Sequence, residues 1–252
     1  MSGRGRHSSR DGTVREWASC NGVAIQLMGV MSSDRLFDPP PRFEGLPPDG
    51  FEAFAIRDRV ARRRRILETF HPPLRALGDD LIEGLRSTPP LRLHLPRLDW
   101  PAGYQPFCTW LALSRRAQGY QAEAQLNVGV HRDHVSIRLG WDTSAPGFGR
   151  FAFLCRNGSL GDELRTVARE TGLRLRVYAS SPWPQGSRAV HESEDDLTGA
   201  LRAVERIGVW FELGERHELP ESRVFATGPE LGSRALAVFS ALLPFYERLS
   251  LE

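Results

Sequence analysis

Apolar and polar residues alternate along several short stretches in the middle of the chain. Leu91, Leu93 and Leu95 are separated by Arg92 and His94, and the same period of two residues returns over residues 107–114, 124–130 and 135–139. A period of two sends successive side chains to opposite faces of a β-strand. Because short turn-forming segments separate these stretches, the pattern predicts an antiparallel meander over residues 91–140, with one buried face and one polar, open face.

Helical periodicity flanks this meander on both sides. Apolar residues spaced three or four positions apart predict helices over residues 57–70, 74–85 and 230–249. Pro72 and Pro73 are expected to separate the first two, because proline lacks a backbone N–H and clashes with the preceding turn. The intervening region predicts two helices and two strands, at residues 161–170, 197–204, 173–177 and 207–213. We therefore expect an α+β fold, in which a largely antiparallel sheet packs against N-terminal and C-terminal helices.

The first fifth of the chain has a different composition. Residues 1–12 are rich in Gly, Ser and Arg, and residues 38–49 contain a cluster of prolines. Such segments bury too little apolar surface to offset the entropy lost on ordering. We expect residues 1–49 to be disordered or a mis-called N-terminal extension, with Met31 as a second candidate start. Residues 50–252 are expected to form a single α+β domain.

All 33 basic residues are arginine, and this excludes several mechanisms. Without lysine there is no Schiff-base chemistry and no phosphate-binding lysine of a P-loop or a protein kinase. The net charge of +2 falls entirely within residues 1–30, which hold four arginines and two acids. The remainder is therefore neutral and lacks the bulk positive charge that is typical of a non-specific nucleic-acid binder.

The cysteines and the apolar segments indicate where in the cell the protein is expected. Cys20, Cys108 and Cys155 are widely spaced and contain no CxxC pair, so neither a disulfide framework nor a cysteine zinc site is expected. No apolar run is long enough to span a membrane, and the apolar stretch at residues 23–30 makes a poor signal peptide. These features favour a cytoplasmic protein without membrane partners.

Two motifs could hold a metal or a cofactor. The run His131-Arg132-Asp133-His134 contains ligands suited to zinc or iron, but polar residues are also expected in a tight turn. Residues 147–152 fit the GxGxxA pattern of dinucleotide sites, yet no strand ends directly at the first glycine, so a loop is the preferred interpretation. We expect neither a metal nor a cofactor.

One part of the chain resembles a known family. The matching residues are Gly50 to Ile56, followed by Arg62, Ile66, Pro72, Leu74, Leu77, Gly78, His94, Thr109-Trp110, Gly119-Tyr120 and Leu126 to Gly129. This pattern resembles the start of the YktB-like proteins, a family of uncharacterised bacterial proteins. The resemblance implies one compact, cytosolic α+β domain and no established activity. Some polar family positions are not kept here, since Leu98, Gln118 and Gln125 replace two histidines and an arginine.

The preferred functional hypothesis is a non-catalytic binding module. The polar face of the predicted meander would hold a small anionic or nucleotide-like ligand. The candidate binding residues are His94, Trp110, Tyr120, Gln125, Asn127 and Arg138.

Two alternatives come from other functional classes. Arg62, Arg63, Arg64 and Arg65, together with outward strand arginines, could capture phosphates of a nucleic acid. Alternatively, His94 could act as an acid or base beside Asp99 or Glu123. Spacing along the chain does not fix the geometry of any catalytic set, so the sequence leaves open whether the protein is an enzyme.

Overall fold

The alternating stretches form neighbouring strands of one sheet in the computed structural model, which describes residues 43–99, 107–116, 121, 123–179 and 189–250. These residues belong to the unit that spans Pro40–Glu252. Seven strands pair in the order β1-β2-β3-β4-β7-β5-β6, and every pairing is antiparallel. The strands are β1 (Arg92–His94), β2 (Cys108–Ser114), β3 (Gln125–His131), β4 (His134–Asp142), β5 (Arg174–Tyr178), β6 (His191–Ser193) and β7 (Trp210–Glu218). The predicted fold class and meander are confirmed.

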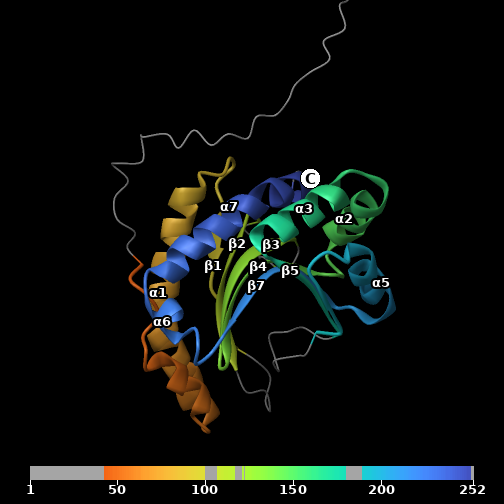
Figure 1. Cartoon of the computed structure of the whole chain (residues 1–252). Coiled ribbons are helices and arrows are strands. Elements are labelled where there is room, and N and C mark those ends of the chain that lie inside the picture. The colour runs from red at the N-terminus through yellow and green to blue at the C-terminus, as the bar shows by residue number, and fades with distance from the viewer. Residues whose placement is uncertain (1–42, 100–106, 117–120, 122, 180–188, 251–252) are drawn as a thin grey trace, which may run out of the picture. The chain divides into compact units, whose positions relative to one another are not determined.

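The helices of the described chain lie around this sheet (Figure 1). They are the 3-10 helix η2 (Gly50–Ala55) and the α-helices α1 (Arg59–Leu85), α2 (Pro146–Asn157), α3 (Leu160–Thr171), α5 (Leu197–Ile207), α6 (Arg223–Thr227) and α7 (Glu230–Ser250). None of the described helices is long and apolar enough to cross a bilayer.

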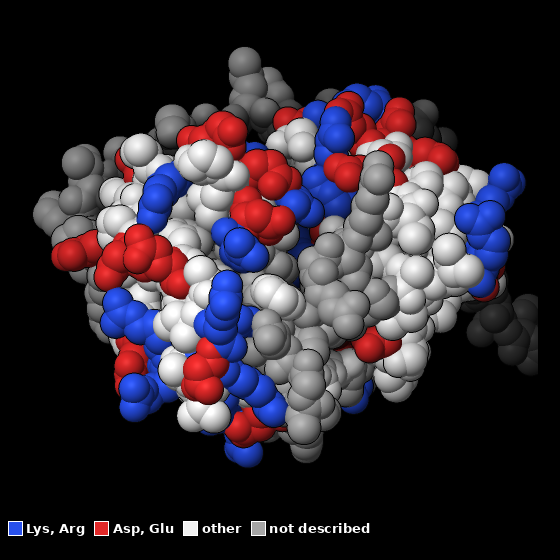
Figure 2. Space-filling view, turned by 90° about the horizontal axis from the view of Figure 1, so that it is seen from below, with Lys and Arg blue, Asp and Glu red and all other residues white. Residues whose placement is uncertain are grey.

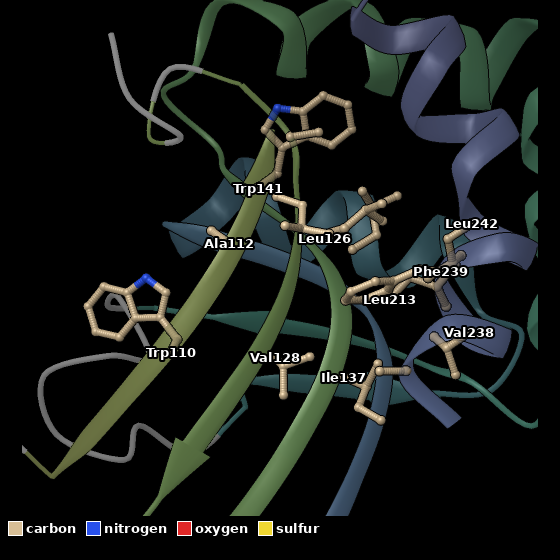
Figure 3. Close-up of a cluster of buried hydrophobic side chains, with 14 of the residues drawn as sticks. Trp110, Ala112, Leu126, Val128, Ile137, Trp141, Leu213, Val238, Phe239 and Leu242 are labelled. Atoms are coloured by element: carbon tan, nitrogen blue, oxygen red, sulfur yellow. The ribbon is translucent and has the colours of Figure 1, made fainter. Parts of the chain in front are cut away.

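The main core lies between the sheet and the helices. Figure 3 shows Leu126, Ile137 and Leu213 on the side of the sheet that faces α7, while Trp110 lies on the other side of β2. On the helix-facing side, Trp141 packs against Phe151 of α2, with ring centroids 4.9 Å apart. Leu126, Ile137 and Leu213 are each 0% exposed, so these side chains are shielded from water. We call this side of the sheet the apolar face.

Helix α1 differs from the sequence prediction, because it continues without a break through Pro72 and Pro73. Two prolines remove two backbone hydrogen bonds and cost roughly 3 kcal/mol each in a helix interior. The apolar stripe, however, runs straight across them and consists of Ile66, Phe70, Leu74, Leu77 and Leu81, each at most 1% exposed. Burying each such side chain contributes about 1.5–3 kcal/mol, which outweighs the loss. The predicted break at residues 71–73 is wrong.

Residues 147–152 also differ from their prediction as a loop, because they lie inside α2. Pro146 occupies the first turn, where its missing N–H costs nothing and its fixed φ favours the helix. Phe148 and Phe151 then pack against Trp141 and Phe211 of the sheet. Tertiary burial of these rings therefore overrides the poor helix propensity of Gly147 and Gly149.

Residues 43–49, which the sequence groups with the N-terminal segment, contribute to the core. Phe43 is 2% exposed, and its backbone amide donates to Asp80 Oδ2 of α1 at 2.7 Å. Leu46 is 1% exposed, and its amide donates to the carbonyl oxygen of Ala226 at 3.1 Å. The position of the domain boundary at residue 50 stays a prediction.

Candidate functional site

The side of the sheet opposite the apolar face carries most of the predicted binding residues. In the register, Ala112 pairs with Asn127, Asn127 with Arg138, and Arg138 with Gly214. Trp110 and Gln125 share this face because they lie two residues from Ala112 and Asn127 on their own strands. We call it the polar face and define it by Trp110, Gln125, Asn127, Gly129, His131, His134, Ser136, Arg138, Arg176, Tyr178, Trp210 and Glu212.

Two other candidates stand apart from the centre of this face. His94 lies on the edge strand β1, opposite Ala112. Tyr120 lies outside the described residues.

The polar face is buried, so the expectation of an open, solvated face is wrong. Asn127 is 0% exposed, Gln125 1% and Arg138 2%. Buried polar groups are costly unless they are hydrogen-bonded. Here polar side chains bond to one another, and the first such bond lies within β3, where Asn127 Nδ2 donates to Gln125 Oε1 at 3.1 Å. The burial makes this face an internal polar site.

An ion pair anchors the site. Arg138 Nη1 of β4 donates to Glu212 Oε2 of β7 at 2.5 Å. Glu212 also accepts hydrogen bonds from the Tyr178 hydroxyl at 3.0 Å and from Trp210 Nε1 at 3.2 Å. Burial, followed by the charge of Glu212, raises the pKa of Tyr178, so its phenol stays protonated and remains a donor. Glu212 is thereby fixed in place and in turn orients Arg138.

Arg176 extends the pair toward the sheet edge. Its Nη1 lies 3.7 Å from Glu212 Oε1, and its Nε lies 3.1 Å from Glu192 Oε1. Arg138 and Arg176 thus share the buried carboxylate of Glu212, and Arg176 has a second acidic neighbour in Glu192.

Two histidines from the β3–β4 hairpin close one end of the face. The rings of His131 and His134 stack with centroids 3.9 Å apart. Burial lowers the pKa of His131 well below its usual value, and the nearby charges of His134, Arg138 and Arg216 lower it further. Burial also lowers the pKa of His134, although its hydrogen bond to Asp133 opposes this shift. Both rings are therefore neutral at pH 7 and can act as hydrogen-bond donors or acceptors.

Three side chains converge over the bare backbone of Gly129. The position that a Cβ would take there is 2.7 Å from Ser136 Oγ, 2.9 Å from His131 Nε2 and 3.2 Å from Arg138 Nη2. Trp110 pairs with Gly129 from one neighbouring strand and Ser136 pairs with it from the other. Only glycine permits this close approach, so polar tips gather at one point on the floor of the face.

Two atoms of this face have no hydrogen-bond partner within the described part of the chain. They are Asn127 Oδ1 and Ser136 Oγ, both fully buried. An unpaired buried polar atom costs roughly 1–3 kcal/mol, and such atoms are rare in native structures. Both atoms can accept a hydrogen bond, and the serine hydroxyl can also donate one.

The predicted acid or base pair at His94 is not assembled as expected. His94 Nε2 lies 3.0 Å from Ser114 Oγ. Asp99 instead pairs with Arg63 at 2.5 Å, and Glu123 Oε1 accepts the backbone amides of Arg115 and Arg116, each at 2.8 Å. The charge of Glu123 raises the pKa of His94, but burial, the larger effect, lowers it. Both candidate carboxylates therefore already have structural hydrogen-bond partners.

The arginine run of α1 is engaged within the protein. Arg62 is buried, donates to the carbonyl oxygen of Ile56 at 2.5 Å and lies over the ring of Phe107 at 5.5 Å. The next three arginines pair with acids: Arg63 with Asp99, Arg64 with Glu68 and Arg65 with Asp49. No observation on this helix favours phosphate capture over these internal pairs.

A cleft of about 350 Å³ opens where β7 runs past the start of β5. It is lined by Gly172, Arg174, Arg176, Glu192, Glu215, Arg216 and Glu218. Its arginines are paired with its acids, as in the contact of Arg174 with Glu192 at 3.3 Å. Figure 2 shows basic and acidic side chains similarly interspersed over the surface seen from below.

No three His, Cys, Asp or Glu side chains gather to hold a metal ion within the part of the chain that the structure describes. Cys108 lies on the polar face, where it pairs with His131 in the register. Burial raises the pKa of its thiol to about 12, so the thiol is protonated and is not a ready nucleophile.

Four of the twelve residues that define the polar face were among the binding residues expected from the sequence, and the other eight were not. Glu212 lies between the apolar residues Phe211 and Leu213 in the predicted strand 207–213. This alternation already indicated that its side chain points to the face opposite the core. Ser136 alternates with Val135 and Ile137 in the same way. Pairing of Arg138 with Glu212 had no such signal, because the two strands are far apart in the chain.

Comparisons with known proteins agree with the resemblance seen in the sequence. The family model described as a domain of unknown function, DUF1054, matches residues 48–172. UPF0637 proteins from two strains of Listeria monocytogenes serotype 4b, CLIP80459 and F2365, are 22% identical over 210 residues. That match covers 81% of this chain and 97% of each relative.

A shorter match has higher identity. A UPF0637 protein from Lactococcus lactis subsp. cremoris, strain SK11, is 30% identical over 92 residues, which are 35% of this chain and 46% of that protein. The matched segment thus spans less than half the length of the Lactococcus protein. These descriptions name no activity.

Proposed function

Because the chain is a divergent member of the YktB-like family of uncharacterised bacterial proteins, whose descriptions name no activity, we propose a function from its own geometry. The protein binds a small anionic or nucleotide-like molecule on the polar face and does not transform it.

One observation carries this proposal, namely the two buried atoms Asn127 Oδ1 and Ser136 Oγ. They lie on the same face and on adjacent strands, since Ser136 pairs with Gly129, which is two residues from Asn127 on β3. The amide of Asn127 is oriented by its hydrogen bond to Gln125, so Oδ1 is directed away from that partner. A ligand that donates to Oδ1 and bonds the Ser136 hydroxyl would offset the cost of burying both.

The other polar-face residues fit such a ligand. Trp110 pairs with Gly129 in the register and provides an aromatic wall beside the floor of the site. Arg138 Nη2 lies over the same glycine and offers a charged donor to an anionic group. An aromatic wall with a few oriented polar groups is typical of small-molecule sites.

Binding without catalysis is supported by the state of the reactive groups. The thiol of Cys108 is protonated, and Asp99 and Glu123 are engaged elsewhere. Cys108 and Cys155 are buried free thiols, which suits the reducing cytoplasm that we propose as its location.

The test is a binding panel read by isothermal titration calorimetry. The panel holds adenosine, AMP, uridine, UMP, benzamide and benzoate, in a chloride buffer without phosphate. We expect at least one compound to bind the wild-type protein and to bind Asn127→Ala about 10-fold more weakly, because one oriented acceptor is lost. Val128→Ala is the matched control, since Val128 is equally buried but faces the core. Equal binding by Asn127→Ala and wild type contradicts the proposal.

A further inference from the structure

We infer that the polar face recognises an oxyanion, a carboxylate or a phosphate group, through Arg138, Ser136 and His131 at the floor formed by Gly129, with Glu212 as the positioning residue. This inference rests on the proposed function and names the chemical class of its ligand. Neither Ser136, His131 nor Glu212 was among the binding residues expected from the sequence.

The first argument is geometric. Ser136 Oγ, His131 Nε2 and Arg138 Nη2 all approach one point above Gly129, at 2.7, 2.9 and 3.2 Å. A hydroxyl, an imidazole and a guanidinium can all donate hydrogen bonds, and an oxyanion accepts several at once. The three tips therefore lie close to one another, so a single oxyanion can accept hydrogen bonds from more than one of them.

The second argument concerns orientation. The Arg138 Nη1 edge is held by Glu212, whose oxygens also accept from Tyr178 and Trp210. With Nη1 fixed in this way, the other terminal nitrogen, Nη2, is directed over Gly129. Glu212 thus acts through Arg138, and the guanidinium is preorganised for a planar or tetrahedral anion.

The third argument is the hydroxyl of Ser136. Its Oγ is buried and has no hydrogen-bond partner within the described part of the chain. An oxyanion that accepts a hydrogen bond from this hydroxyl would offset the cost of burying it.

The experiment compares molecules that share a body and differ in the oxyanion: AMP with adenosine, UMP with uridine, and benzoate with benzamide. Titration calorimetry on the full chain is expected to show that the charged member of at least one pair binds about 10-fold or more tightly than its neutral partner. The nucleotide pairs test phosphate and the benzoate pair tests carboxylate.

The variants locate that preference. Ser136→Ala is expected to weaken binding of the charged member about 10-fold and to leave that of the neutral member unchanged, because one hydrogen bond to the anion is lost. The double variant Arg138→Met/Glu212→Gln removes both charges of the pair and leaves the net charge of the site unchanged, so the preference should disappear while the chain still folds. Thr109→Val, an equally buried hydroxyl on the apolar face, is the matched control and should keep the preference.

The outcomes separate the two proposals. If both members of every pair bind equally and Asn127→Ala still weakens them, the polar face binds ligands but the oxyanion inference is overturned. The same conclusion follows if the charged member is preferred and neither Ser136→Ala nor the double variant changes that preference, since the anion then lies elsewhere. If no compound binds, both the proposed function and this inference are contradicted.

Discussion

At the scale of single residues, Gly129 determines the shape of the polar face. Its missing side chain lets Ser136 and His131 approach the strand backbone more closely than any Cβ would allow. A methyl group at this point would force these side chains out of position. The residue therefore links local packing directly to the arrangement of the candidate binding groups.

Two glycine substitutions should have opposite effects on stability. Gly129→Ala is expected to lower the free energy of unfolding by about 1–3 kcal/mol, because the new methyl overpacks a closed site. Gly149→Ala should raise it by up to about 1 kcal/mol, because that helical glycine has nothing within 4 Å of its added Cβ. Urea unfolding followed by circular dichroism measures both changes. A neutral or stabilising Gly129→Ala would show that the site has room to adjust.

The buried pair of Arg138 and Glu212 should couple strongly. Arg138→Met leaves a buried carboxylate without its cation, and we expect a loss of about 3–5 kcal/mol. Adding Glu212→Gln to the same chain removes that unpaired charge, so the double variant should be more stable than Arg138→Met alone. Denaturant unfolding of both variants and of Glu212→Gln completes a double-mutant cycle. Additive losses would mean that the two side chains act independently.

At the scale of elements, helix α1 shows packing overriding local propensity. Its apolar stripe crosses Pro72 and Pro73 and stays buried along the whole length. A sequence-based prediction treats adjacent prolines as a helix end, because it weighs the lost hydrogen bonds and not the tertiary contacts that follow.

Replacing an exposed proline of α1 should stabilise the protein. Pro72→Ala restores a backbone donor in the helix interior, and we expect a gain of about 1–3 kcal/mol in the free energy of unfolding. Leu74→Ala, two residues further along the helix, should instead cost about 2–5 kcal/mol, because Leu74 is 0% exposed. Thermal and urea unfolding test both changes. A loss of stability on Pro72→Ala would show that the prolines set a required bend.

The β3–β4 hairpin should make stability depend on pH. The pKa of His131 lies well below 6.5 in the folded protein, so the unfolded chain binds more protons once the pH falls below about 6.5. Stability should therefore decrease from pH 7.5 to pH 5, by at most about 1.4 kcal/mol per pH unit for each such histidine.

The effect can be assigned to the hairpin by substitution. His131→Phe keeps an aromatic ring to stack on His134 but has no titrating group, so its stability should change less with pH than that of wild type. Urea unfolding midpoints at pH 7.5, 6.5, 5.5 and 5.0 measure how steeply the stability of each protein changes with pH. An equal pH dependence in His131→Phe and wild type would mean that another group titrates.

At the scale of the whole molecule, the described N-terminal residues 43–49 act as part of the packed body. Phe43 and Leu46 are buried against elements that lie far along the chain, at Asp80 and Ala226. Composition alone groups these residues with the preceding proline-rich segment, because isolated Phe and Leu give no periodic signal.

Shortening the chain in two steps tests this assignment. A chain that begins at Phe43 should unfold with nearly the same free energy as the full chain, because the composition of residues 1–42 predicts no stable core. A chain that begins at Gly50 should lose several kcal/mol, because each buried side chain of Phe43 and Leu46 contributes about 1.5–3 kcal/mol. Thermal unfolding of the two shortened chains gives the comparison, and equal midpoints would place the boundary at residue 50.

The sequence by itself determined the strands of the meander and the face to which their side chains point. Trp110, Gln125, Asn127 and Arg138 were assigned to one face from the period of two alone, because strand geometry is local and needs only neighbouring residues. The same local rule identified the flanking helices, and particular residues, from Gly50 to Gly129, indicated the family.

Only the tertiary structure decided which strands are neighbours and what the polar side chains meet. β7 lies between β4 and β5, and this order brings Glu212 to Arg138 across 74 residues of sequence. Burial of the polar face and continuity of α1 through its prolines were likewise decided by long-range contacts. Such contacts depend on the total free energy of the packed chain, and no local pattern of hydrophobic and polar residues contains that information.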